Sequence, residues 1–245
     1  EHLLGPAEDF DEERHDAEFH DFVMREIDVY GCMSRHALGV LAEEYGRPGV
    51  LMPGGVNMEE FQPAAARERR PTVLFSGALD QARKGAAILL RGVPTLLETA
   101  PDLQVWLSGP GDPEPLLAEL PQRVRACVEV LPIGDPKGQA NRYATAWVVA
   151  LPSKWESFGM VVAEALACGT PVAVADHAAL PELVEPGVTG MLCDPDDVAS
   201  VASAVAGALD LASRSETVEA CRASVMRFDW RTGIAPELER IYAGD

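Results

Sequence analysis

Two glutamates, Glu156 and Glu164, stand eight positions apart in the segment KWESFGMVVAEALACGTPVAVA, which covers residues 154–175. The residues around them are mostly apolar, as expected for a segment that packs against a core. An unpaired buried carboxylate is costly, so each glutamate must accept hydrogen bonds from some donor. For Glu164 that donor could be a backbone group, an arginine or a bound ligand.

The elements that must position these glutamates are a strand, a loop and a helix. We expect the helix to begin at Ser157, which can cap it, and to end before Gly169, which can take the left-handed conformation. Glu156 then lies in the loop that leaves an apolar strand at residues 147–153, and Glu164 lies nearly two turns into the helix.

Beyond Pro71, short apolar runs alternate with longer segments of helical periodicity. This alternation predicts an α/β fold with a Rossmann-like doubly wound parallel sheet, which binds ligands at the carboxyl ends of its strands. The strands are predicted at 72–77, 103–109, 127–132, 147–153, 171–176 and 189–194. The main helices are predicted at 85–100, 114–125, 138–146, 157–168 and 197–212. The loops that should share the ligand edge are 77–85, 109–113, 132–138, 152–158 and 176–181.

We place the main body of the fold at residues 48–227. The two ends of the chain lack its alternation of strands and helices. Residues 1–47 contain an acidic amphipathic helix, with Phe10, Ala17, Phe22 and Val23 on one stripe, and a strand and helix closed by Gly46. One such βα unit is too small for a core of its own, so we interpret it as the remnant of another domain. Residues 228–245 form a last helix.

The composition excludes several classes of function. Lys and Arg number 20 against 39 Asp and Glu, a net charge of -19, which argues against a nucleic-acid partner and a polybasic membrane patch. An anionic ligand must then be captured locally by placed cations and backbone amides. The five widely spaced cysteines contain no CxxC pair, which indicates reduced thiols in the cytoplasm. The chain opens without a basic, apolar leader, so we expect a fragment or a processed chain.

The pattern Glu-(x7)-Glu within PSKWESFGMVVAEALACGTPVAVAD resembles the signature of retaining GT-B glycosyltransferases of family four. The similarity runs almost continuously over residues 28–212, and agreement of several motifs in order is more specific than one glycine-rich loop. The other motifs that carry it are VLFSGALDQARKG (73–85), LSGPGDPEP (107–115), LPELVEPGVTGMLCDPDD (180–197) and the linker VLMPGGVNMEEFQP (50–63).

The resemblance implies two facing Rossmann-like domains that bind a nucleotide-diphospho-sugar, with UDP or GDP as the nucleotide. Glu156 would face the sugar hydroxyls, Glu164 would accept hydrogen bonds from the ribose hydroxyls, and Lys84 would stabilise the diphosphate leaving group. The base would lie on the loop 131–135, which contains Ile133. The other implied donor-binding residues are Gly77, Arg83, Ser157, Phe158, Gly159, Met160 and Val161.

The same resemblance implies transfer with retention to an acceptor sugar, lipid or small molecule, without a metal or other cofactor. Most of the acceptor-binding domain would be missing here, so we expect the donor-binding half of a cytoplasmic enzyme, placed at the inner face of the membrane if that domain binds lipid. The helix 228–245 would cross back toward it. The retaining-glycosidase interpretation is disfavoured, because it needs two carboxyl groups about 5 Å apart.

Departures from the family pattern leave donor identity and activity open. Ala78 stands where the family usually has an arginine, and the adjacent Arg83 could replace it or be a solvated loop residue. The first alternative is therefore a non-catalytic sugar-nucleotide-binding or scaffold module. A nonhydrolysing sugar-nucleotide epimerase is disfavoured by the spacing of the two glutamates.

Histidines and tryptophans offer weaker candidates. His15 and His20 lie five positions apart on different sides of a helix, which favours a solvated acidic face over a metal site. His36 is interpreted as a helix-start residue. His177 follows a strand on the ligand edge and could contact a bound sugar, and Trp155 could border the same pocket.

Overall fold

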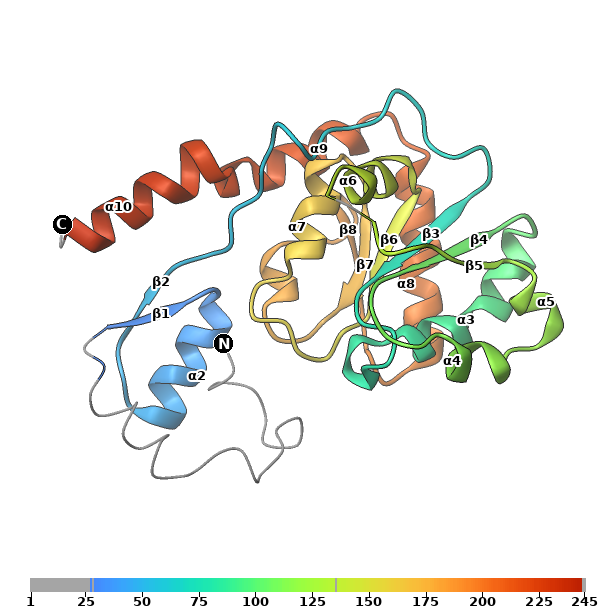
Figure 1. The fold of residues 1–245 in the computed structure, drawn as a ribbon, viewed down its shortest axis with the longest axis horizontal. Helices are drawn as coiled ribbons and strands as arrows, with labels where there is room; N and C mark the ends of the chain where they lie inside the picture. The colour runs from blue at the N-terminus through green and yellow to red at the C-terminus, as the bar shows by residue number, and fades with distance from the viewer. Residues whose placement is uncertain (1–26, 28, 135, 244–245) are drawn as a thin grey trace.

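The structure is a computed structural model that describes residues 27, 29–134 and 136–243. Its main body is a six-stranded parallel sheet with the order β5-β4-β3-β6-β7-β8 (Figure 1). The strands are β3 (Thr72–Ser76), β4 (Gln104–Ser108), β5 (Val128–Val130), β6 (Val148–Leu151), β7 (Val172–Ala175) and β8 (Gly190–Cys193). The predicted doubly wound α/β sheet is confirmed, and each predicted strand is present with slightly shorter bounds.

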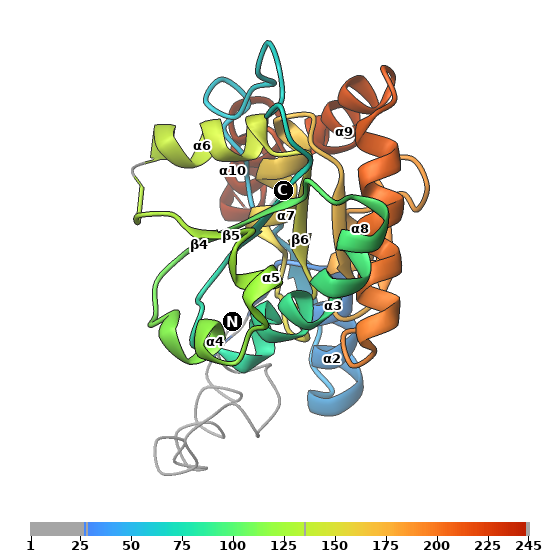
Figure 2. The same cartoon turned by 90° about the vertical axis from the view of Figure 1, so that its right-hand side faces the viewer.

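Helices cover both faces of this sheet (Figure 2). On one face α3 (Ala86–Thr99) packs against α8 (Val198–Ala212), and on the other α6 (Pro136–Thr145) packs against α7 (Met160–Ala167), which also contacts α9 (Thr217–Val225). Every residue of β3, β6 and β7 is therefore buried, which explains why these strands are almost wholly apolar.

Two predicted helix bounds are wrong. The segment 114–125 divides into α4 (Glu114–Ala118) and α5 (Gln122–Arg125), because Pro121 between them is extended, with φ -55° and ψ 145°. Helix α7 begins at Met160 and not at Ser157, because Gly159 holds a left-handed φ of 96° that a helix cannot contain.

The buried Phe158 explains this late start of α7. Its ring packs edge-on against Phe228, with 5.1 Å between the ring centroids, so the chain enters the core at Phe158 before it turns into the helix. The end of α7 agrees with the prediction, because Gly169 has a φ of 75°.

A small parallel unit precedes the main sheet and consists of β1 (Tyr30–Cys32), α2 (Arg35–Tyr45) and β2 (Gly49–Leu51). Ser34 caps α2 by accepting a hydrogen bond from the amide of Ala37, and Gly46 ends the helix with a φ of 62°, as predicted. The acidic helix that we predict upstream lies outside the described residues, and the division of the chain near residue 47 stays a prediction.

Glu182 holds this small unit against the main sheet. Its carboxylate accepts hydrogen bonds from the backbone amides of Arg35 at 3.0 Å and His36 at 2.8 Å, the first two residues of α2. Glu182 ends the short 3-10 helix η4 (Leu180–Glu182), which follows β7. Because the first turn of α2 has no acidic residue of its own, Glu182 supplies the negative charge that a helix N-terminus favours.

The C-terminal segment is less regular than the single helix predicted for it. It consists of the 3-10 turn η5 (Met226–Phe228), the π-helical turn η6 (Trp230–Ile234) and α10 (Ala235–Ala243). The Val56 amide donates to the Phe228 carbonyl and the Trp230 amide donates to the Val56 carbonyl, which joins this segment to the linker after β2. Among the residues that the structure describes, no helix has the length and apolar character needed to cross a bilayer.

Candidate functional site

A cavity of about 790 Å³ opens at the carboxyl ends of β3 and β6. The main body contributes the end of β3, the 3-10 turn η3 (Ala82–Lys84), the loop after β6 and the start of α7, while β1 and α2 form the other wall. This edge is where doubly wound sheets bind ligands, so the cavity is the candidate site. Nine predicted site residues line it: Gly77, Arg83, Lys84, Glu156, Ser157, Phe158, Gly159, Met160 and Val161.

A salt bridge between Lys84 and Glu156 lies in the wall of this cavity. The Lys84 Nζ is 2.7 Å from the Glu156 Oε1, and the two side chains are only 19% and 14% exposed. Burial makes the pair costly to form and more costly to break, since either charge alone would be poorly solvated. The structure thus places one cation and one carboxylate, 72 positions apart in sequence, on the same cavity surface.

Arg83 fastens the turn η3 to the loop after β6. Its Nη1 donates a hydrogen bond to the Trp155 carbonyl at 3.0 Å, and the Lys154 amide donates to the Arg83 carbonyl at 2.9 Å. Arg83 also lines the cavity. It is therefore a bonded part of the site and not a solvated loop residue.

Gly85 allows η3 to approach the loop after β6. It has a φ of 83°, and a Cβ atom at this position would lie 2.3 Å from the Pro152 carbonyl oxygen. Backbone cannot move aside as a flexible side chain can, so any other residue must displace η3 and the lysine that ends it.

We expect Gly85→Ala to lower the free energy of unfolding by about 2 kcal/mol or more, because it combines a left-handed φ with a backbone clash. The matched control is Gly39→Ala in α2, where a Cβ meets nothing within 4 Å and φ is ordinary. The control should raise stability by about 0.5–1 kcal/mol. Urea unfolding of both variants measures the difference, and equal small effects would contradict the role of Gly85.

The N-terminus of α7 faces the same cavity. Gly159, Met160 and Val161 line it, and Gly159 caps the helix without a side-chain hydrogen bond. The first amides of a helix have no intrahelical acceptor, and the helix dipole makes this end partly positive. Together with Lys84 they form a surface suited to an anion such as a phosphate group. Ser157 lines the cavity but does not cap the helix.

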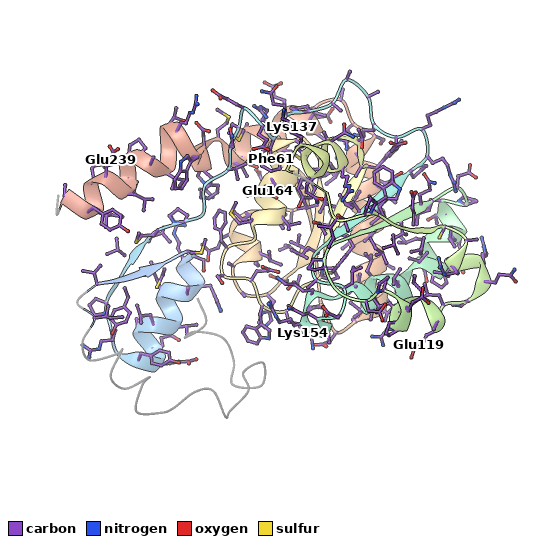
Figure 3. All side chains as sticks on the ribbon, in the orientation of Figure 1. Phe61, Glu119, Lys137, Lys154, Glu164 and Glu239 are labelled. Carbon is purple, nitrogen blue, oxygen red and sulfur yellow. The ribbon has the colours of Figure 1, made fainter. Side chains whose placement is uncertain are left out.

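Glu164 lies one turn further along α7, beside α6 (Figure 3). The pKa of its carboxyl group is raised to about 7, mainly because the group is buried, while the nearby Tyr143 hydroxyl lowers this pKa and Glu60 adds to the rise. Among the described residues, the polar side chain that acts on the Glu164 carboxyl group is therefore that of Tyr143, and neither a backbone group nor an arginine is hydrogen-bonded to it.

The raised pKa of Glu164 has a measurable effect on stability. A carboxyl group whose pKa is higher in the folded than in the unfolded state stabilises the fold at low pH and loses that contribution as pH rises toward 7. We expect Glu164→Gln to gain about 1–2 kcal/mol over the original chain between about pH 5.5 and pH 8. Urea unfolding of both proteins at the two pH values tests this. A difference that does not change with pH would contradict it.

Two of the eleven predicted site residues, Glu164 and Ile133, do not line the cavity. Ile133 is 76% exposed on the loop after β5 and does not line the cavity, and Asp135 of that loop lies outside the described residues. The loop is anchored by Arg142, whose Nη2 donates to the Pro132 carbonyl at 2.7 Å. Binding of a base by Ile133 stays a prediction.

The cavity wall supplied by the small N-terminal unit was not predicted from the sequence. His36 and Ala37 of α2 line the cavity, as do residues of β1, and no site role was predicted for any of them. A strand prediction at Gly49–Leu51 could have revealed this wall. The strand pairs with β1 and completes a βαβ unit, whose helix can then face the site.

The remaining aromatic candidates lie near the site. Trp155 lines the cavity, and the His177 ring packs edge-on against it with 4.6 Å between centroids. His15 and His20 lie outside the described residues. Within the part of the chain that the structure describes, no group of three or more His, Cys, Asp or Glu side chains could hold a metal ion.

Comparison with known proteins identifies relatives. The family described as Glycosyl transferases group 1 matches residues 70–210. The chain is 34% identical over 210 residues to the phosphatidyl-myo-inositol mannosyltransferase of Mycobacterium tuberculosis, covering 82% of this chain and 55% of that protein. It is 35% identical over 200 residues to the D-inositol 3-phosphate glycosyltransferase of Acidothermus cellulolyticus, covering 74% and 44%. The chain thus spans about half the length of the curated relatives it matches.

Solved structures share the same architecture. Sucrose-phosphate synthase from Thermosynechococcus elongatus aligns with a TM-score of 0.78 at 26% identity, over 96% of this chain and 63% of that one. Anabaena Alr3699/HepE, solved in complex with UDP-glucose, aligns with a TM-score of 0.80 at 20% identity, over 99% and 70%. At that identity the second likeness concerns the fold alone.

Proposed function

This chain belongs to the glycosyl transferases group 1 family, and from that premise we propose that its cavity binds the nucleotide-diphospho-sugar donor of a glycosyltransferase. The observation that carries the proposal is the half-buried ion pair of Lys84 and Glu156 beside the N-terminus of α7. Lysine and helix amides suit a diphosphate, and a carboxylate beside them suits the hydroxyl groups of a sugar. In a chain with a net charge of -19, these local donors would have to overcome the overall field.

In this proposal the two glutamates divide the donor between them. Glu156 contacts the sugar near its anomeric carbon, and Glu164, one turn deeper on α7, accepts hydrogen bonds from the ribose. The HepE protein, which shares this fold and was solved with UDP-glucose bound, supports a nucleotide-sugar of this class. UDP and GDP are both candidate carriers.

We further propose that transfer proceeds with retention and without a metal. The acceptor hydroxyl would attack the anomeric carbon on the face that the diphosphate leaves, and the diphosphate would take the hydroxyl proton. Lys84 would stabilise the charge that develops on the leaving group. The acceptor-binding domain would be supplied from outside residues 1–245, and this chain alone would transfer little. Closure of that domain would supply positioning and exclude water.

The names of the relatives suggest which acceptors to test first. The names of both relatives contain an inositol compound, phosphatidyl-myo-inositol in one and D-inositol 3-phosphate in the other. An inositol phosphate and a phosphatidylinositol vesicle would separate a soluble acceptor from a lipid at the cytoplasmic membrane face. Other sugars remain candidates.

The alternative is a sugar-nucleotide-binding module without catalysis. It is favoured by Ala78, which leaves Lys84 without the arginine that usually shares the diphosphate, while Arg83 is engaged with the Trp155 carbonyl. Transfer measured after fusion to an acceptor-binding domain separates the two functions.

The test of the proposal is a calorimetric titration with UDP, GDP and their hexose derivatives, followed by the matching nucleosides. We expect one diphosphate to bind and its nucleoside to bind far more weakly. If no nucleotide or nucleotide-sugar binds, the proposed function is wrong.

A further inference from the structure

We propose that Arg142 is a positioning residue for recognition of the nucleotide base, because its guanidinium group fastens the loop after β5 to the wall of the donor cavity. This inference rests on the proposed function and deepens it, since it names the residue that would hold the base-binding loop in one conformation. The loop consists of residues 131–134, and Arg142 belongs to α6, the next helix in the chain.

The loop of residues 131–134 lies at the ligand edge of the sheet. It starts by continuing the pairing of β5 with β4, because the Leu131 amide donates to the Leu107 carbonyl at 2.8 Å. Its Ile133 side chain is 76% exposed and gives this edge an apolar surface that a flat heteroaromatic base could cover. Beyond Leu131 the loop leaves the sheet, so other contacts must keep it in one conformation.

Arg142 contacts this loop at two points. Its Nη2 donates a hydrogen bond to the Pro132 carbonyl at 2.7 Å. The backbone of Gly134 passes against the same guanidinium group, because a Cβ atom at Gly134 would lie 3.3 Å from the Arg142 Cζ, Nη1 and Nη2. The residues on both sides of Ile133 therefore rest on one planar, rigid group.

The other arm of the guanidinium group is fixed to the main sheet. The Arg142 Nη1 donates to the Oγ of Ser108, the last residue of β4, at 2.8 Å, and Ser108 is 3% exposed. The same nitrogen lies 3.3 Å from the Gln139 Oε1, and the Gln139 Nε2 donates to the Ser76 Oγ at 3.0 Å. Because Ser76 lines the donor cavity, these hydrogen bonds join the loop to the cavity wall.

The partners of Arg142 favour a positioning role over direct attraction of phosphate. All these acceptors are neutral, and no carboxylate in the described part of the chain forms an ion pair with Arg142. Arg142 does not line the cavity that contains Lys84. The contacts use two nitrogen atoms held in a fixed plane, whereas a lysine would supply the same charge from a single nitrogen.

The test measures binding of UDP, GDP and inorganic pyrophosphate, which has no base, to the original chain, to Arg142→Met and to Arg142→Lys. We expect both substitutions to weaken binding of the tighter-binding nucleotide about tenfold and to leave pyrophosphate binding unchanged. The matched control is Arg123→Met in α5, which should change neither. It removes the same charge and a hydrogen bond to a backbone carbonyl, that of Leu97, and lies before β5 instead of after it.

Recovery of nucleotide binding in Arg142→Lys would show that only the charge matters and would overturn the inference. An equal loss for nucleotide and pyrophosphate would also overturn it, because a general loss of structure or of charge affects both. If neither variant folds, Ser108→Ala takes their place, since it removes the Nη1 acceptor without changing any charge.

Ser108→Ala should weaken nucleotide binding about threefold and leave pyrophosphate binding unchanged. Failure of the original chain to bind UDP or GDP would reject the proposed function and this inference together. Nucleotide binding that none of these variants alters would reject the inference alone.

Discussion

Replacing Lys84 with methionine is expected to weaken binding of a nucleoside diphosphate by about 30- to 1000-fold, or about 2–4 kcal/mol, and to change binding of the nucleoside little. Lys84 is the cation of the buried pair in the cavity wall, and its side chain is 19% exposed. Its loss removes the charge that would meet the diphosphate. It also leaves Glu156, a carboxylate, unpaired beside an anionic ligand, which adds repulsion to the lost attraction.

Lys154→Met is the control for this prediction. Lys154 lies on the loop after β6 and is paired with Asp196, so the substitution removes the same charge, and Lys154 does not line the cavity. Calorimetric titration of both variants with diphosphate and nucleoside separates a direct contact of Lys84 with the phosphates from the general effect of removing one positive charge. Equal losses in the two variants, or an equal loss for nucleoside and diphosphate, would show that Lys84 does not meet the phosphates.

Glu156→Gln is expected to reduce sugar transfer by about 100-fold in an enzyme completed with an acceptor-binding domain, while diphosphate binding stays the same or becomes tighter. The reason lies in the salt bridge. The Glu156 carboxylate lies 2.7 Å from the Lys84 ammonium, and an amide in its place would release that charge for the diphosphate. The sugar would meanwhile lose a charged acceptor.

Steady-state transfer rates and diphosphate titrations of Glu156→Gln measure these opposite effects. The exposed Glu119, on the surface after α4, gives the control variant Glu119→Gln, which makes the same change in net charge far from the cavity (Figure 3). Weaker binding of the bare diphosphate in Glu156→Gln would contradict the proposed division of the donor between the two glutamates.

The order of elements was predictable from the sequence because a parallel sheet covered on both faces produces long apolar runs separated by helical periodicity. The presence of Lys84 and Glu156 on the same edge of the sheet was predictable, because loops 77–85 and 152–158 both follow strands of a parallel sheet, but their direct contact across 72 positions was not. The start of α7 was not predictable from Ser157. Ser157 favours a helix start locally. The burial of Phe158 and the left-handed conformation of Gly159 prevent a helix from starting there.

The partner of Glu164 could not be predicted for a related reason. Tyr143 has an ordinary place on the buried face of α6, and nothing in its spacing shows that it affects the pKa of a carboxyl group on α7. Hydrogen bonds between side chains of different elements depend on how those elements pack. Periodicity gives the buried face of each helix but does not give the neighbour across it.

The hydrogen bonds from α2 to Glu182 determine how this part of the chain can be exchanged between related proteins. A chimera joined in the linker after β2 would take α2 from one parent and Glu182 from the other. The hydrogen bonds between them, and the cavity wall that α2 forms, would then combine residues from two different proteins. A junction placed before Tyr30 keeps the βαβ unit and the Glu182 carboxylate that binds α2 in the same parent sequence. The transplantable module is therefore larger than the six-stranded sheet, and donor specificity should travel with the longer segment.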